Sequence, residues 1–276
     1  MSENFTLLIA GPDHDHVRNM VRLNHDAVAT IVVSRWENGT NPVASYSEEI
    51  VSSPFPDETR LKRLHNSQNV YLQATSVLAG LEKVKTPYVI KTRSDEYFSN
   101  LSIITKSFNP EKLLCANIFV RDVSYRPYHI SDHLFVGRTD RIRRAFLDLK
   151  EYIETSADCD KFGILNARTP AETKIALFYL QACGYEIERL LSFSECQSYG
   201  VMKKEFDVFD VDTLQPLCIS SSVAGQITNY RKYVRRDSVL GLRYIYKIDQ
   251  IAQQGKLNLF LQRGVFKLRR LLSKVR

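Results

Sequence analysis

The sequence predicts an α/β fold built on a largely parallel sheet flanked by helices. The short apolar run 5–11 is typical of a buried strand, and the continuous β-branched run 28–34 is typical of a strand that is covered on both faces. A segment with helical spacing separates them, and strand, helix and strand in close succession indicate a βαβ unit. A chain of 276 residues has room for one large domain, or for one domain with an extension.

The first unit begins with the run 5–11, which closes on Gly-Pro, a turn signal. Apolar residues recur at helical intervals over 16–26, so a helix is predicted there before the strand 28–34. A loop rich in Asn, Gly and Pro then follows over 37–44.

A second unit follows along the chain. The spacing of apolar residues predicts a helix over 68–84, which Thr86-Pro87 ends, and a buried strand that begins at 88 and becomes polar before 98. Further elements are expected as a strand at 112–121 and helices at 139–154 and 170–183. We divide the chain into a domain over 1–205 and an extension over 206–276.

The positive charge is concentrated at the C-terminus. The chain has 38 Lys and Arg against 31 Asp and Glu, and all of the +7 excess lies in its last 22 residues, which contain no acid. Leucine and phenylalanine alternate with these cations, which predicts a basic amphipathic helix over 256–276 that lies on an anionic membrane surface. A solvated terminal helix is the alternative, and the balanced charge elsewhere argues against nucleic acid as a partner.

The cysteines and the apolar runs indicate a compartment. Five widely spaced cysteines without a C-x-x-C pair argue against a disulfide framework and for a reducing environment. The sequence shows neither a run of about 18 apolar residues nor a signal-peptide pattern. We expect a cytoplasmic protein, peripheral on the inner face of the cytoplasmic membrane.

Polar residues follow three of the predicted strands directly, at 11–15, 34–37 and 91–96. In sheets of this kind ligands bind at the carboxyl ends of the strands. We therefore expect the three clusters to share one crevice.

The segment 91–96 reads KTRSDE. Alternation along an extended chain places Lys91, Arg93 and Asp95 on one side. Two cations and a carboxylate suit a diphosphate bound through a divalent metal, since hard cations prefer oxygen ligands. The alternative is a solvated strand end with local ion pairs.

A second polar cluster contains His129, Asp132 and His133. An aspartate beside imidazoles can act as a general base toward a hydroxyl group, and a histidine can bind a metal. A polar loop that satisfies its own hydrogen bonds is the alternative.

The run 13–16 (DHDH) reads as the lip of a nucleotide site with Asp15 as a helix cap, and a metal-dependent phosphoesterase using this run is a second possible function.

Five motifs occur in order over roughly 5–185. Their residues are Ser34, Trp36 and Glu37; Asn69, Gln73, Ser76, Gly80 and Leu81; Lys91, Arg93, Ser94 and Asp95; His129, Asp132 and Gly137; and Pro170 and Glu172. In this order and spacing the sequence resembles the WavE lipopolysaccharide-synthesis family. Leu72 stands where the family has an arginine, and it raises the alternative of a non-catalytic, membrane-associated assembly protein.

The resemblance implies a GT-A-like glycosyltransferase that moves a sugar from a nucleotide-diphosphate donor to a lipopolysaccharide or other surface-polysaccharide acceptor. The acceptor is expected to be a saccharide or a lipid-linked molecule. It implies a divalent metal, Mn²⁺ or Mg²⁺. The implied catalytic residues are Asp132 or Glu172 as the base, and His129. The implied donor-binding residues are Gly11, Ser34, Arg35, Glu37, Asn69, Gln73, Lys91, Arg93 and Asp95, and the implied metal ligands are Asp95, Glu96 and His133.

Overall fold

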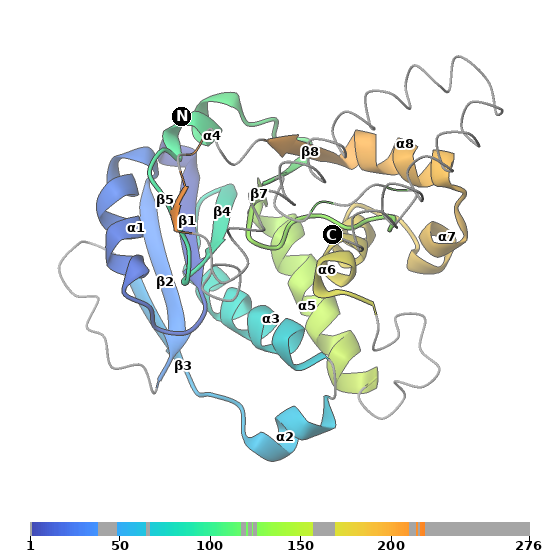
Figure 1. Cartoon of the computed structure of the whole chain (residues 1–276), viewed down its shortest axis with the longest axis horizontal. Helices are drawn as coiled ribbons and strands as arrows, with labels where there is room; N and C mark the ends of the chain where they lie inside the picture. The colour runs from blue at the N-terminus through green and yellow to red at the C-terminus, as the bar shows by residue number, and fades with distance from the viewer. Residues whose placement is uncertain are drawn as a thin grey trace, which may run out of the picture.

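The computed structural model describes residues 2–37, 49–64, 67–116, 120, 123, 126–156, 169–209, 214 and 216–218. Its centre is a seven-stranded sheet in the order β3-β2-β1-β4-β7-β6-β8 (Figure 1). The strands are β1 (Phe5–Ala10), β2 (Thr30–Trp36), β3 (Glu49–Ser53), β4 (Tyr88–Arg93), β6 (Leu113–Ala116), β7 (Leu134–Arg138) and β8 (Phe206–Phe209). Strand β7 is antiparallel to both of its neighbours and the other pairs are parallel, so the predicted α/β fold with a mostly parallel sheet is confirmed.

Helices lie on both faces of this sheet, and a small second sheet pairs β5 (Tyr97–Phe98) with β9 (Pro216–Cys218) (Figure 1). The helices are α1 (His16–Asn24), α2 (Glu58–Arg63), α3 (Gln68–Leu81), α4 (Ser102–Ser107), α5 (Thr139–Ser156), α6 (Ala171–Ala182), α7 (Ile187–Ser192) and α8 (Glu195–Glu205), with 3₁₀ turns at Ser2–Asn4 and His25–Ala27. None of the helices in the described part of the chain has the length and hydropathy needed to cross a bilayer.

Side-chain alternation along the strands divides the core in two. Leu7 and Ile9 of β1 pack with α1 and α4 on one face, while Leu8 and Ala10 pack with α3, α5 and α6 on the other. Both faces of the strand are therefore buried, which explains its continuous apolar sequence.

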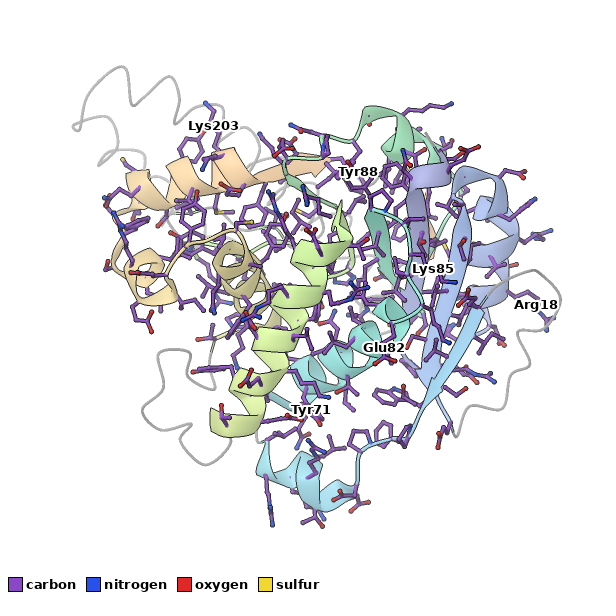
Figure 2. All side chains as sticks on the ribbon, turned by 180° about the vertical axis from the view of Figure 1, so that it is seen from behind. Arg18, Tyr71, Glu82, Lys85, Tyr88 and Lys203 are labelled. Atoms are coloured by element: carbon purple, nitrogen blue, oxygen red, sulfur yellow. The ribbon has the colours of Figure 1, made fainter. Side chains whose placement is uncertain are left out.

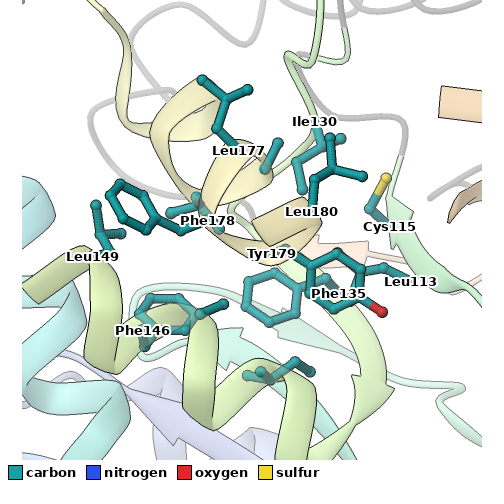
Figure 3. Packing of buried hydrophobic residues seen from close by; sticks show 14 of the residues in the cluster. Leu113, Cys115, Ile130, Phe135, Phe146, Leu149, Leu177, Phe178, Tyr179 and Leu180 are labelled. Atoms are coloured by element: carbon teal, nitrogen blue, oxygen red, sulfur yellow. The ribbon is translucent and has the colours of Figure 1, made fainter. Parts of the chain in front are cut away.

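The core under α3, α5 and α6 is the more aromatic of the two. Figure 3 shows Phe135 of β7 and Phe146 of α5 packed beside the apolar residues of α6, and the two phenyl rings stack with centroids 6.1 Å apart. Figure 2 shows the molecule from behind, with Tyr71 near the start of α3 and Glu82 just past its end, where the chain reverses through Lys85 into β4 at Tyr88. The packing fixes α3 against the strands that carry the polar residues.

The observed elements differ from the predicted ones mainly at their ends. The predicted helix 16–26 ends at Asn24. The side-chain amide of Asn24 donates to the carbonyls of Met20 and Phe98 and closes the last turn. The predicted strand that begins at 88 ends at Arg93, where a turn follows, and the predicted strand 112–121 is a strand over Leu113–Ala116.

Several further elements were not expected from the sequence, namely β3, β7 and β8 of the main sheet and helices α2, α4, α7 and α8. Strand β3 adds an edge to the sheet after the 37–44 loop. Residues 206–209, which our division places in the extension, form β8 and pair in parallel with β6. The predicted basic helix over 256–276 lies outside the described residues.

Candidate active site

The ends of β1, β2 and β4 lie side by side at one edge of the sheet. The Gly11 amide donates to the Ser34 carbonyl oxygen at 3.1 Å, and the Ser94 amide donates to the Ala10 carbonyl oxygen at 3.3 Å. Gly11 has a φ of +147°, and a Cβ at this position would lie 2.4 Å from Ser94 Oγ. A residue without a side chain is therefore needed where the first loop crosses β4.

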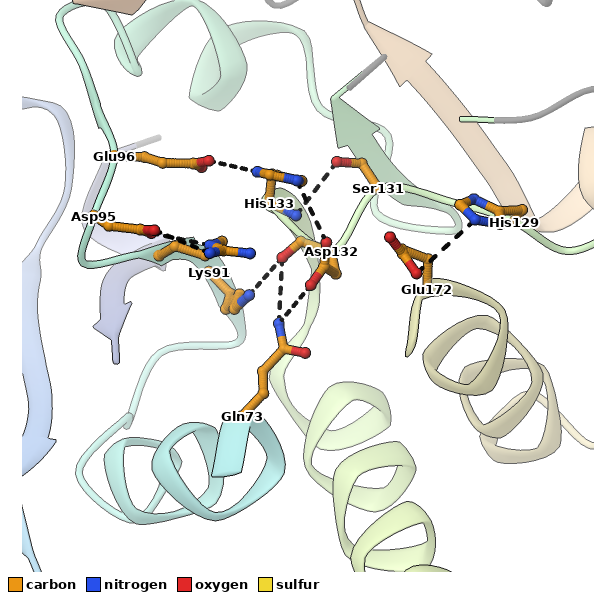
Figure 4. A network of polar contacts seen from close by, with 10 residues as sticks. Gln73, Lys91, Asp95, Glu96, His129, Ser131, Asp132, His133 and Glu172 are labelled. Atoms are coloured by element: carbon orange, nitrogen blue, oxygen red, sulfur yellow. Dashed lines mark hydrogen bonds and ion pairs between the residues drawn. The ribbon is translucent and has the colours of Figure 1, made fainter. Parts of the chain in front are cut away.

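The reversed direction of β7 brings the second polar cluster to the same edge. Phe135 of β7 pairs with Lys91, and Leu134 pairs with Thr92. Because β7 runs against β4, the residues just before it, 129–133, reach the carboxyl end of β4. Figure 4 shows Lys91, Asp95 and Glu96 facing Asp132 and His133 across this junction.

Arg93 and Asp95 form a two-pronged ion pair at the end of β4. Arg93 Nε donates to Asp95 Oδ1 and Arg93 Nη2 donates to Asp95 Oδ2, each at 2.9 Å. The two side chains are 31% and 18% exposed, so both reach solvent at the strand end. An arginine fork of this geometry also suits a phosphate group.

Lys91 is buried completely, unlike Arg93. Its ammonium donates to the backbone carbonyl of Asp132 at 2.5 Å and lies 5.2 Å from the centre of the Phe135 ring. Burial is the main cause that lowers the pKa of Lys91, to about 8, and the carboxylates of Asp132 and Glu96 oppose the shift.

The Asp132 carboxylate is held from two sides. Gln73 Nε2 donates to Asp132 Oδ2 at 3.2 Å, and His133 Nε2 lies 3.7 Å from Asp132 Oδ1. Burial would raise the pKa of Asp132, but the charges of His133 and Lys91 outweigh it and hold this pKa below its ordinary value. The side chain is 10% exposed, so only a small part of it reaches solvent.

Glu96 and His133 form an ion pair inside the protein. His133 Nδ1 contacts Glu96 Oε1, and the two side chains are at most 3% exposed. Glu96 Oε2 is buried, with no hydrogen-bond partner among the residues that the structure describes. Burial lowers the pKa of His133, but the Glu96 charge and hydrogen bond outweigh it, so this pKa is raised overall.

His129 and Glu172 meet at the start of α6. His129 Nε2 lies 3.9 Å from Glu172 Oε2, with the imidazole buried and the carboxylate 22% exposed. Pro170 holds the N-cap position of α6, which places Glu172 in the first turn, where the helix dipole favours a carboxylate. The preceding Tyr128 has a φ of 58°, and its hydroxyl lies 3.0 Å from Ser198 Oγ.

The remaining residues implied as donor contacts are placed differently from one another. Ser34 is buried, and its hydroxyl donates to the Ser76 carbonyl at 2.6 Å, which fixes α3 to β2. Arg35 forms an ion pair with Asp13 at 3.3 Å. Glu37 and Asn69 are exposed, one just after β2 and the other at the beginning of α3.

The 13–16 run does not assemble as a compact cluster. Asp13 pairs with Arg35, and the His14 and His16 rings stack with centroids 4.3 Å apart. Asp15 holds the N-cap position of α1 but makes no side-chain cap bond, because its backbone is already helical (φ −58°, ψ −25°). Across the described ranges, no three His, Cys, Asp or Glu side chains are gathered closely enough to bind one metal ion.

One residue near the site was not singled out from the sequence. Lys174, in α6, is 2% exposed, and its ammonium donates to Ser67 Oγ at 2.9 Å. A lysine directly before the apolar run 175–180 was the available signal, because a charge is buried only with partners.

A cavity of about 520 Å³ lies between α5, α6 and the start of α7. It is lined by carboxylates and aromatic rings, among them Asp148, Glu151, Tyr152 and Phe178. None of the residues around Asp132 or Asp95 lines it, so this cavity is separate from the polar network.

The fold and this edge together define an α/β protein with a cluster of charged side chains at the carboxyl ends of its parallel strands. The family model described as WavE lipopolysaccharide synthesis matches residues 17–209. The chain therefore belongs to the WavE family, as its motifs indicated, and membership connects it with lipopolysaccharide biosynthesis. No curated protein matches the chain significantly.

Proposed function

We propose that the protein is a glycosyltransferase with a GT-A-like fold, which transfers a sugar from a nucleotide-diphosphate donor to a lipopolysaccharide or other surface-polysaccharide acceptor. The observation that carries the proposal is the Arg93–Asp95 pair, which reaches solvent where three parallel strands end. Membership of the WavE family supports the biosynthetic setting.

The exposed pair suits a diphosphate and its counter-ion. Arg93 offers a planar fork of donors to the phosphate oxygens. Asp95 fits a divalent metal, Mn²⁺ or Mg²⁺, because Mg²⁺ is commonly held by one or two carboxylates together with substrate phosphates. Such an ion would neutralise charge that develops on the leaving diphosphate. Glu96 and His133 are at most 3% exposed, whereas Asp95 is 18% exposed, so we assign the metal contact to Asp95, which would exchange part of its pairing with Arg93 for the ion.

The acceptor hydroxyl needs a base. In the transfer, the acceptor oxygen bonds to the anomeric carbon, the bond from that carbon to the diphosphate breaks, and the hydroxyl proton passes to a carboxylate. Asp132 is ionised and oriented by Gln73, so it is our first choice. Glu172, more exposed and beside His129, is the second.

Donor binding gives the first test. We expect the protein with Mn²⁺ to be stabilised against thermal unfolding by at least one of UDP, GDP, ADP, CDP and dTDP. We expect Asp95→Asn to lose more than about 100-fold in transfer, because the substitution removes the charge that holds the metal, and to keep its fold by circular dichroism. The matched control is Asp207→Asn, which changes an aspartate on β8 that is paired with Lys112.

Either of two results would count against the proposal. Full transfer activity in Asp95→Asn would remove the assigned role. Stable binding to anionic lipid without binding of any nucleotide would favour an assembly protein without catalysis.

A further inference from the structure

The polar network at the end of β4 holds more residues than need to touch a substrate (Figure 4). We infer that Lys91 and the Glu96–His133 pair are positioning residues. They fix Asp132 in the orientation of a base. The inference rests on the proposed function, since it gives these residues a task in that transfer reaction.

Lys91 holds the backbone of Asp132. Its ammonium has no exposed surface, and it donates to the Asp132 carbonyl from a strand 41 residues away in sequence. A diphosphate at the strand end would meet the partly exposed Arg93 before it could reach Lys91. The buried lysine therefore ties the loop before β7 to the centre of the sheet.

The side chain of Asp132 is held by other residues. Gln73 donates to Oδ2, and the His133 imidazole faces Oδ1 at 3.7 Å. Glu96 fixes the far side of that imidazole, and Ser131 Oγ accepts from the His133 amide at 3.3 Å. The result is a chain of carboxylate, imidazole and carboxylate, in which Glu96 and His133 are at most 3% exposed and Asp132 is 10% exposed.

Such a chain has a use in base catalysis. A base must point at the hydroxyl proton, and an orienting group behind it keeps that geometry. With one oxygen facing His133 and the other accepting from Gln73, the Asp132 carboxylate keeps a fixed direction. A transferase in which Lys91 is lost would bind its donor and fail to activate its acceptor.

Binding of nucleoside diphosphates separates positioning from phosphate contact. We expect Lys91→Met to leave the Kd for UDP, or for whichever of the tested nucleoside diphosphates binds best, within about twofold of wild type. Arg93→Met should weaken it by about tenfold or more, since it removes charged hydrogen bonds to the ligand. Calorimetry gives the binding stoichiometry too, so that the folded fraction of each variant is known.

Turnover with two nucleophiles supplies the second readout. Per folded molecule, Lys91→Met should lower kcat with the natural acceptor class by about 100-fold, the usual contribution of a general base. Azide carries no proton to remove; its attack on the anomeric carbon gives a glycosyl azide and free nucleoside diphosphate. Azide should therefore restore donor consumption in Lys91→Met, as in Asp132→Ala, and a merely structural defect would not respond.

A milder variant and a control keep the test decisive if Lys91→Met folds poorly. Gln73, which is half-buried on α3, donates to Asp132 Oδ2, and Gln73→Met removes this bond. The variant should show the same pattern of preserved Kd, lowered kcat and azide rescue. Arg143→Met removes a cation that also donates to a backbone carbonyl, that of Leu81, and it should match wild type per folded molecule.

The outcomes separate the positioning role from the transferase activity. A tenfold loss of nucleotide affinity in Lys91→Met, or low turnover that azide does not restore, overturns the positioning role while leaving the transferase proposal intact. If the wild-type protein binds none of the nucleoside diphosphates, the proposed function fails, and this inference fails with it.

Discussion

Single residues at the site are arranged as compensated charges. Lys91, Arg93 and His133 stand against Asp95, Glu96 and Asp132, and none of the six is isolated from the others. Charges can be buried at this density because each has an opposite charge or a hydrogen bond beside it.

The Glu96–His133 pair predicts a pH dependence of stability. The pKa of His133 is raised in the folded state, so its imidazolium stabilises the fold fully below pH 6.5 and less as the pH rises through the folded pKa. Glu96→Gln removes the partner. We expect it to lower the free energy of unfolding by about 3 kcal/mol at pH 6, and to flatten the fall seen in wild type above pH 6.5.

Urea unfolding from pH 6 to 9 measures both effects. Glu205→Gln, which changes a buried carboxylate paired with the exposed Lys204, is the matched control and should keep the wild-type slope. A Glu96→Gln variant with the same pH slope as wild type would contradict the predicted role of the pair.

The sequence predicted which residues meet but not how they are paired. The KTRSDE and 129–133 segments were both recognised as chemical, and the structure brings them together. Alternation placed Lys91, Arg93 and Asp95 on one side, yet the strand ends at Arg93 and the turn folds Asp95 back onto it. The burial of Lys91 depends on a carbonyl far away in sequence, which no local pattern reveals.

At the scale of elements, the approach of α3 to the sheet sets the position of Gln73. Gly80 allows this approach: a Cβ there would lie 2.3 Å from Leu8 Cδ1 and 3.0 Å from Ser34 Cβ. The Ser34 hydroxyl also donates to the Ser76 carbonyl at the same contact. Helix α3 is therefore seated on β1 and β2 by a glycine and a serine.

Replacing each of two helical glycines by alanine tests how closely α3 must pack on β1 and β2. Gly80→Ala should destabilise the protein by about 1–3 kcal/mol, because the methyl group would force α3 away from the sheet. In α8, a methyl group on Gly200 would have no described atom within 4 Å outside its own helix turn, so Gly200→Ala should stabilise by about 0.5–1 kcal/mol through helix propensity alone. Thermal unfolding of both variants measures the difference, and equal effects would show that α3 tolerates the added methyl.

Element prediction succeeded where the local pattern was strong. The helices 139–154 and 170–183 appear as α5 and α6 with ends shifted by at most two residues. Strand β7 was not predicted, and its five residues, LFVGR, would fit a parallel or an antiparallel strand equally. Strand β3, which has one buried residue, two half-buried and two exposed ones, lacks the apolar run that marks the inner strands.

At the scale of the whole molecule, the excess charge lies in the last 22 residues, outside the described part of the chain. We predict that the full chain sediments with vesicles containing phosphatidylserine at low salt, and that a chain ending at residue 255 does not. Each basic residue near such a surface contributes about 1 kcal/mol, and salt screens the attraction.

A variant with glutamine at the seven basic positions of 256–276 separates charge from hydrophobic contact. It should lose vesicle binding while keeping the unfolding temperature of the wild type. Equal sedimentation of the truncated and full chains would contradict a membrane role for this segment.

Strand β4 lies at the middle of the sheet, hydrogen-bonded to β1 on one side and to β7 on the other, with both faces covered. Amide protons in such a strand exchange with deuterium only when the entire domain opens, whereas edge strands such as β3 exchange through local fraying. We therefore expect β4, the strand that precedes the residues proposed to bind the donor, to be among the slowest-exchanging strands. A destabilised but folded variant should therefore lose its outer strands before it loses the geometry on which catalysis would depend.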